Sequence, residues 1–226
     1  MGTTGRLLGS GRTCDVYEYE IDGTWVLRRN REGWGDALAE GRVMEHVRAH
    51  GCPVPRVRLA DSTRTELVME RVAGVTMLEA FGAGTLGVRE GGEILAGLLR
   101  QLHGIPGRHS SGRILHLDLH PDNVMLTPDG QPVVIDWSNA EEGHPGLDWA
   151  MSAVILAQVA VDDGPLAHLS DLAHAGLAAL LADPSQLTEE GLAEARNRRS
   201  RNPTMSTREV ELLGDAEELI RTYWRG

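Results

Sequence analysis

The segment His116-Leu117-Asp118-Leu119-His120-Pro121-Asp122-Asn123 constrains the fold more than any other part of this chain. Two short apolar runs follow, at residues 123–126 and 132–135, and the Thr127-Pro128-Asp129-Gly130 sequence between them is typical of a hairpin turn. The hairpin ends on Asp136 and should bring its carboxylate back toward Asp118 and Asn123. We therefore expect three oxygen-bearing side chains to meet, and oxygen ligands are what Mg²⁺ prefers.

Elsewhere the chain divides into a β-rich first part and a helical remainder. Short apolar segments separated by turn residues predict strands at 6–8, 16–21, 25–28, 57–59 and 66–70, and a helix at 36–50. Helical patterns follow at 90–103, 147–161, 166–182 and 188–196, and a capping box at Ser206–Glu209 begins a last helix. We expect an α+β fold with two lobes, a β-rich N-lobe at 1–73 and a larger, mostly helical C-lobe at 74–226.

Composition restricts the partners. No apolar run approaches the roughly 20 residues of a membrane helix, and the N-terminal segment does not resemble a signal peptide, so we expect a cytoplasmic protein with no membrane partner. The net charge of −11 argues against nucleic acid. From Asp136 onward there are sixteen acidic residues and seven arginines, a balance of −9. This negative charge either favours a cationic ligand or only keeps the protein surface soluble. Cys14 and Cys52 are expected to be free thiols.

The segment 116–123, taken with Ile135-Asp136-Trp137, resembles the catalytic loop and metal motif of protein kinases. It is closer still to the aminoglycoside phosphotransferase and choline kinase family. This resemblance implies a protein-kinase-like fold that uses ATP and Mg²⁺. It also implies that Asp118 is the catalytic base, that Asn123 and Asp136 bind Mg²⁺, that His116 braces the loop and that His120 helps to shape it.

The resemblance extends upstream. Residues 9–16, Gly-Ser-Gly-Arg-Thr-Cys-Asp-Val, resemble the glycine-rich loop of kinases, with Cys14 at the third glycine position. Glycines let backbone N–H groups approach phosphates, so Gly9, Ser10 and Gly11 are expected to bind the nucleotide. Arg28, on the next strand, stands where kinases place a lysine, and the chain has no lysine at all. The alternative is an exposed strand arginine.

Glu40 is the expected partner of Arg28. At 100° per residue it falls in the middle of an apolar helix face, where a carboxylate needs a partner, whereas Glu45 falls on the polar side. A carboxylate at the rim of that face is the alternative. Residues 67–74 resemble the last N-lobe strand and hinge, which implies adenine binding through the backbone at Glu70 and Val72. Asp148 resembles the acid that supports the catalytic loop, unless it is a simple helix N-terminal acid.

Departures from the kinase pattern narrow the function. Leu117 stands where protein kinases have an arginine and the small-molecule kinases a glycine, and only 12 positions separate Asp136 from Asp148, too few for an activation segment. We therefore expect a kinase for the hydroxyl of a small molecule, with aminoglycoside-like acceptors first and other antibiotics or sugars second. A nucleotide-binding pseudokinase and a protein or RNA kinase stay open. The basic run at 196–201 is either solvated or binds an anion. The oligomeric state is not indicated.

Overall fold

The computed structural model describes residues 3–20, 22–31, 34–183 and 186–225. They form two compact units, one made of Met1–Val75 with Met125–Ala140 and the other of Thr76–Val124 with Glu141–Gly226. The hairpin that follows the catalytic-loop motif therefore groups with the first unit. The lobe boundary at residues 73 and 74 stays a prediction.

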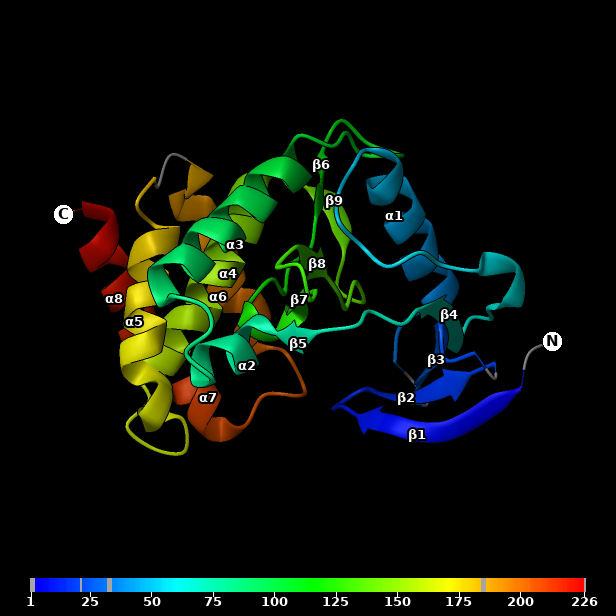
Figure 1. The fold of residues 1–226 in the computed structure, drawn as a ribbon. Coiled ribbons are helices and arrows are strands. Elements are labelled where there is room, and N and C mark those ends of the chain that lie inside the picture. Colours follow the sequence, from blue (N-terminus) through cyan, green and yellow to red (C-terminus); the bar gives the residue numbers. More distant parts are fainter. Residues whose placement is uncertain (1–2, 21, 32–33, 184–185, 226) are drawn as a thin grey trace. The chain divides into compact units, whose positions relative to one another are not determined.

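The first unit is built on an antiparallel sheet in the order β1-β2-β3-β4 (Figure 1). Its strands are β1 (Thr4–Ser10), β2 (Cys14–Tyr19), β3 (Trp25–Asn30) and β4 (Glu66–Glu70). Val16 pairs with Arg28 and Cys14 with Asn30, so these four side chains share one face of the sheet, because directly paired and alternate residues point the same way. The strands predicted at 6–8, 25–28 and 66–70 are confirmed. So is the one begun at residue 16, whose predicted end, Ile21, lies outside the described residues.

Helix α1 (Ala37–Ala49) confirms the helix predicted at 36–50. The Asp36 side chain caps it by accepting a hydrogen bond from the Ala39 N–H at 3.1 Å. The chain ends the helix at His50 and turns at Gly51, whose φ is +85°. The buried face carries Val43, Met44 and Val47, as the apolar period predicts, and Glu40 lies among them.

The strand predicted at 57–59 is wrong. Only Val57 forms a bridge, to Met69, and the chain then enters a 3₁₀ turn at Leu59–Asp61. The physical reason is Ser62. Its hydroxyl accepts the Val68 N–H at 2.9 Å and donates to the Arg58 carbonyl at 2.8 Å, so a side chain takes the Val68 N–H that the backbone of a further strand would have bonded.

The predicted hairpin is confirmed as β7 (Val124–Leu126) and β8 (Pro132–Val134). Gly130 has φ +79° and its N–H donates to the Thr127 carbonyl at 2.8 Å. With β5 (Val75–Thr76) the hairpin forms a three-stranded sheet in the order β5-β7-β8. Gly74, with φ +143°, precedes β5, and a Cβ there would lie 2.0 Å from the Leu126 carbonyl oxygen. Glycine is therefore required at this position.

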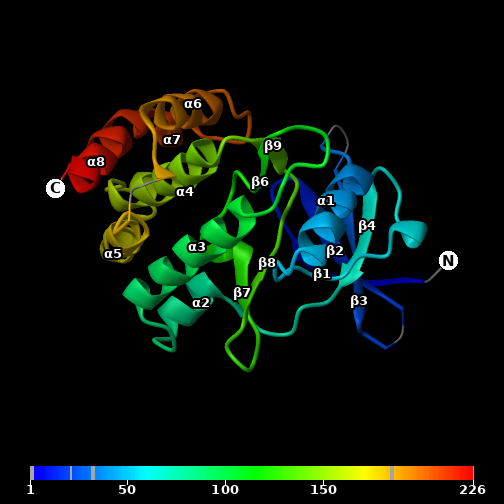
Figure 2. The same ribbon diagram turned by 90° about the horizontal axis from the view of Figure 1, so that it is seen from above.

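The second unit is mostly helical (Figure 2). Its helices are α2 (Met77–Gly82), α3 (Val88–His103), α4 (Pro145–Ala160), α5 (Ser170–Leu180), α6 (Glu189–Ser200), α7 (Thr207–Glu211) and α8 (Leu213–Arg225). Its other elements are strands β6 (Arg113–Leu115) and β9 (Glu141–Gly143), which pair, and 3₁₀ turns Pro121–Asn123 and Ala167–Leu169. Helix α4 is buried over most of its surface and contacts α5, α6 and α8. No helix in the described ranges is long and apolar enough to cross a membrane.

Three of the predicted helices of this unit are confirmed, at 90–103, 147–161 and 188–196, and two differ in detail. The helix predicted at 166–182 begins only at Ser170, because the Asp162 carboxylate accepts the N–H groups of Gly164 and Leu166 and holds that stretch in a turn. The Ser206–Glu209 capping box forms as predicted, but the helix that it begins ends at Glu211 and a separate helix follows.

Candidate active site

The backbone of the catalytic-loop segment is held by one buried carboxylate. Asp148, in the first turn of α4, is completely buried and accepts the backbone N–H groups of His116 at 2.9 Å and Leu117 at 2.7 Å. His103 donates to the same carboxylate through Nε2, also at 2.9 Å. Of the two alternatives for Asp148, the structure supports contact with the loop. The two backbone bonds fix the chain immediately before Asp118, and His103 holds the carboxylate that accepts them.

Leu117 adopts a backbone conformation that is rare for its residue type. Its φ is +62°, in the left-handed region that glycine enters freely and other L residues enter at a cost of roughly 1–2 kcal/mol. A glycine would adopt this conformation without that cost. Here burial of the Leu117 side chain, which is 5% exposed, and the bond to Asp148 hold the conformation.

Asp118 stands at the centre of a short polar network in the second unit. Its backbone N–H donates to His116 Nδ1 at 3.2 Å, and its carbonyl accepts Asn123 Nδ2 at 2.9 Å. His120 Nε2 lies 3.8 Å from an Asp118 carboxylate oxygen and 3.2 Å from Asn123 Nδ2. Desolvation lowers the pKa of His120, although the charge of Asp118 opposes this. The structure thus brings together His116, Asp118, His120 and Asn123.

Arg28, Glu40 and Asp136 come together in the first unit. Arg28 is 4% exposed and forms a buried ion pair with Glu40. Its Nη1 lies 3.3 Å from Asp136 Oδ1, and the second carboxylate oxygen of Glu40 accepts the Trp137 N–H at 3.2 Å. Desolvation alone would lower the pKa of Arg28, but the charges of Glu40 and Asp136 raise it above its ordinary value. The alternatives, an exposed strand arginine and a glutamate at the rim of the helix, are therefore excluded.

The predicted metal ligands each keep an oxygen uncommitted within the described chain. Asn123 donates through Nδ2 and leaves Oδ1 without a donor there. Asp136 accepts Ser138 Oγ at 2.8 Å and Arg28 on Oδ1, and leaves Oδ2. Amide and carboxylate oxygens fit Mg²⁺. The two residues belong to different compact units, so their joint role stays a prediction. No group of three or more His, Cys, Asp or Glu side chains poised for a metal occurs among the described residues.

The glycine-rich loop joins β1 to β2. A Cβ at Gly9 would meet nothing within 4 Å, so the loop surface is open there, and the Gly11 N–H donates to the Cys14 carbonyl at 2.8 Å. The Ser10 hydroxyl is already occupied, since it donates to Asp15 at 2.5 Å. Cys14 is half-buried on the sheet face of Arg28. Burial raises the pKa of its thiol, against the opposing charge of Arg28.

The two predicted hinge residues differ in what their backbones offer. The Glu70 N–H donates to the Arg56 carbonyl at 2.8 Å, and the Glu70 side chain pairs with Arg56. Val72 lies between β4 and β5, and its backbone makes no hydrogen bond within the described residues. Val72 therefore has the freer backbone for a nucleotide base.

Sequence reasoning missed His103. It is the last residue of α3, its side chain is 6% exposed, and its Nδ1 is buried with no hydrogen-bond partner among the described residues. The only sequence signal was a histidine in the last turn of a predicted helix, which is normally explained by the helix dipole. Its bond to Asp148 instead links α3 to the catalytic loop through one carboxylate.

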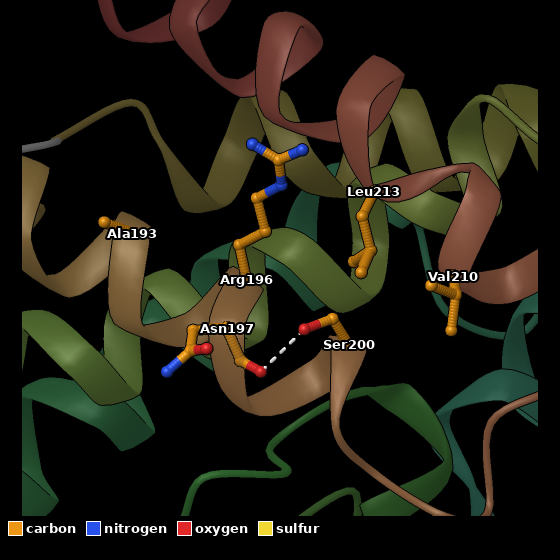
Figure 3. Close-up of a pocket in the computed structure, with 6 residues that line it drawn as sticks. All are labelled: Ala193, Arg196, Asn197, Ser200, Val210 and Leu213. Atoms are coloured by element: carbon orange, nitrogen blue, oxygen red, sulfur yellow. Dashed lines mark hydrogen bonds between the residues drawn. The ribbon is translucent and has the colours of Figure 1, made fainter.

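The described residues also line two shallow surface cavities. One, of about 380 Å³, lies among α6, α7 and α8 and is lined by Ala193, Arg196, Asn197, Ser200, Val210 and Leu213 (Figure 3). The other, of about 510 Å³, is lined by Trp25, Glu45, Arg48, Ala49, Arg56 and Val57. None of the predicted site residues lines either cavity, so neither is assigned to the chemistry.

Comparison with known proteins decides the family. The model of the phosphotransferase enzyme family matches residues 4–113 and 106–189. The chain belongs to this family. It is a small-molecule phosphotransferase, as the sequence motifs predicted. No curated protein matches the sequence.

Solved structures confirm the α+β, protein-kinase-like fold of this phosphotransferase. Aminoglycoside phosphotransferase APH(4)-Ia, in a ternary complex with AMP-PNP and hygromycin B, is 14% identical at a TM-score of 0.54, with 98% of this chain and 94% of that chain covered. An aminoglycoside phosphotransferase from Alicyclobacillus acidocaldarius is 16% identical at a TM-score of 0.53, with 98% and 91% covered. Choline kinase LicA from Streptococcus pneumoniae is 14% identical at a TM-score of 0.55, with 98% and 94% covered.

Proposed function

We propose that this phosphotransferase moves the γ-phosphate of ATP to a hydroxyl group of a small molecule, with Asp118 as the base. The observation that carries the proposal is the support of the Asp118 backbone. Asp148 anchors the two preceding residues, and Asn123 bonds the Asp118 carbonyl. A base must be held within hydrogen-bond reach of the hydroxyl that it deprotonates, so a fixed backbone at this position is what the reaction needs.

Apart from the base, the reaction requires the protein only to position the substrates and to neutralise the phosphate charge. The acceptor hydroxyl loses its proton to Asp118 as its oxygen forms a bond to the γ-phosphorus, and the bond from that phosphorus to the bridging oxygen of ADP breaks. Mg²⁺, when bound, neutralises charge on the phosphates, and Asn123 and Asp136 would hold it. Arg28, fixed by Glu40, supplies a permanent positive charge for the nucleotide phosphates. Gly9, Gly11 and the backbone of Ser10 would cover them.

The acceptor that we propose is cationic and polyhydroxylated, with aminoglycoside-like compounds first. Two observations support this class. One is the acidic balance of −9 from Asp136 onward. The other is that one structural relative was solved with hygromycin B bound. Other antibiotics and sugars are the second choice, and a panel that also contains neutral and anionic alcohols separates the classes.

The test pairs turnover with nucleotide affinity. Phosphate transfer is measured across the acceptor panel with the wild-type protein and with Asp118→Asn, and the affinity for Mg²⁺-ATP is measured by calorimetry. Asp118→Asn should lower turnover by roughly 10²–10⁴, the span for a lost general base, with little change in nucleotide affinity. Asp136→Asn should weaken metal-dependent nucleotide binding as well. An Asp118→Asn protein with near-normal turnover would refute the mechanism, and a wild type that binds ATP without transferring it would indicate a pseudokinase.

A further inference from the structure

One guanidinium group holds the glycine-rich loop closed on itself. Arg31 directly follows β3, and its Nη2 lies 2.8 Å from Ser10 Oγ and 2.9 Å from Asp15 Oδ1. Its Nη1 donates to the Arg12 carbonyl at 3.1 Å. Ser10 also donates to Asp15, which closes the network. A single side chain therefore contacts both stems of the loop and its tip.

We propose that Arg31 is a positioning residue for the nucleotide: its contacts with Ser10, Arg12 and Asp15, here called the Arg31 clasp, fix the conformation in which the loop covers the phosphates. The proposal rests on the proposed use of ATP. Before any ligand arrives, the clasp lowers the number of loop conformations, so less ordering has to accompany nucleotide binding.

The sheet register separates the clasp from the phosphate side. Asp15 pairs with Arg29, whereas Val16 pairs with Arg28. Neighbouring residues on a strand point to opposite faces, so Asp15 lies on the face opposite to Arg28. Arg31, two residues after Arg29, contacts Asp15 on that face. The clasp therefore restrains the loop from the outer face, and its effect on the nucleotide is transmitted through the loop backbone.

The clasp suits a loop that departs from the glycine pattern. Cys14 replaces the third glycine and forms the start of β2. The backbone N–H of Arg31 also donates to the Thr13 carbonyl at 2.8 Å, so the main chain and the side chain of Arg31 bind consecutive parts of the same loop. Arginine is suited to this role, since its planar fork presents several donors in fixed directions. A lysine ammonium at the same place would keep the charge without the fork.

Cys14 provides a reporter of loop opening that needs no nucleotide. It is half-buried and lies at the foot of the loop, so its rate of alkylation should rise when the loop opens and water reaches the thiol. Cys52 serves as the internal control, because it is 4% exposed and burial raises its pKa to about 12. Iodoacetamide labelling followed by peptide mass spectrometry measures both thiols in one sample.

The protein offers a matched control for the substitution. Arg29 forms an ion pair with Glu66 at 2.7 Å, and its side chain is 45% exposed against 44% for Arg31. Arg29→Ala therefore removes an equally exposed arginine two positions earlier, whose side chain contacts Glu66 and the Tyr17 ring and not Ser10, Arg12 or Asp15. Both arginines lie at the surface, so neither substitution should prevent folding.

The experiment compares wild type, Arg31→Ala, Arg31→Lys and Arg29→Ala. Arg31→Ala should label Cys14 about three- to tenfold faster, as expected for losing several charged contacts at an exposed site, and should raise the KM for ATP by a similar factor with kcat nearly unchanged. Arg31→Lys should recover part of both effects, and Arg29→Ala should match wild type. High salt should accelerate labelling in wild type but not in Arg31→Ala, because exposed charge pairs are screened.

Two results would overturn the proposal. One is labelling of Cys14 in Arg31→Ala that is no faster than in wild type, and the other is faster labelling with an unchanged KM for ATP. Labelling is carried out without nucleotide, so it tests the clasp even if the chain transfers no phosphate. Failure of the proposed function would appear separately, as a wild-type protein that binds no ATP.

Discussion

Removing either member of the Arg28–Glu40 pair should strongly destabilise the first unit, and replacing both should destabilise it much less. Both side chains are almost fully buried, 5% and 4% exposed. Loss of one partner leaves a buried charge without compensation, which costs about 3–5 kcal/mol in the free energy of unfolding. Loss of Glu40 is the milder case, because Arg28 keeps its ion pair with Asp136 at 3.3 Å, so this effect should fall at the lower end of that range.

Replacing both residues together should lower the free energy of unfolding much less. Arg28→Met with Glu40→Leu removes both buried charges and keeps similar volume, and such exchanges are often close to neutral. One penalty remains, because the Trp137 N–H loses its acceptor, the Glu40 carboxylate, at 3.2 Å. That unsatisfied donor costs roughly 1–3 kcal/mol. The double variant should therefore be no less stable than either single variant, although the sum of the single effects is about 6–10 kcal/mol.

Urea denaturation measures these free energies, with tryptophan fluorescence and circular dichroism followed together to detect separate unfolding of the two units. The exposed Arg29–Glu66 pair, which joins β3 to β4, is the control, and its cycle should give a coupling of only about 0.2–1 kcal/mol. If the double variant loses the sum of the single effects, within about 0.5 kcal/mol, the two residues are not coupled and the electrostatic account of this site is wrong.

Three further predictions concern other parts of the chain. Desolvation of Glu142 is outweighed by hydrogen bonds from Ser110 and the backbone N–H groups of 108–110, which hold the pKa of this carboxylate at about 2. The ionised carboxylate should therefore contribute roughly 1–3 kcal/mol to the free energy of unfolding above pH 4.5, and this contribution should fade toward pH 2. Glu142→Gln should remove this acid dependence from the urea midpoints, and an unchanged pH profile in the variant would contradict the prediction. Asp148→Asn should lower the free energy of unfolding by about 1–3 kcal/mol, because the amide can no longer accept hydrogen bonds from all three donors. The same variant should reduce kcat more than it raises the KM for ATP, and equal effects on kcat and KM would argue against this prediction. Alkylation of Cys14 should slow when Mg²⁺-ATP is bound, and equal rates with and without nucleotide would place the thiol away from the phosphates.

The sequence was sufficient to predict those parts of the site that depend on patterns within one short segment. Helical periodicity alone placed Glu40 in the middle of a buried face, and the ion pair with Arg28 follows from the need of a buried carboxylate for a partner. Turn chemistry predicted the hairpin that ends at Asp136. The motif around Asp118 predicted which side chains would surround it, since they lie within eight consecutive residues.

What the sequence did not predict depends on contacts between distant segments. His103 is separated from Asp148 by 45 residues, and a histidine that ends a helix has no pattern that points to a distant carboxylate. The strand predicted at 57–59 failed because of one hydroxyl, that of Ser62, which takes the Val68 N–H of β4 in place of a backbone carbonyl. Arg31 showed no signal because a charged residue after a strand is ordinary until the loop that it contacts is known.

Two of the strained backbone positions lie in the predicted active site. The described chain has three non-glycine residues with positive φ: Glu20, Leu117 and Asp136. Two of them lie in the predicted site, one directly before the proposed base and the other a proposed metal ligand. Each such conformation costs roughly 1–3 kcal/mol and persists only where neighbouring bonds enforce it. Asp148 enforces it at Leu117, and at Asp136 the side chain is held by Ser138 and Arg28. The buried carboxylate of Asp148 therefore supports the backbone directly before Asp118, and Arg28 of the buried ion pair contacts the side chain of Asp136.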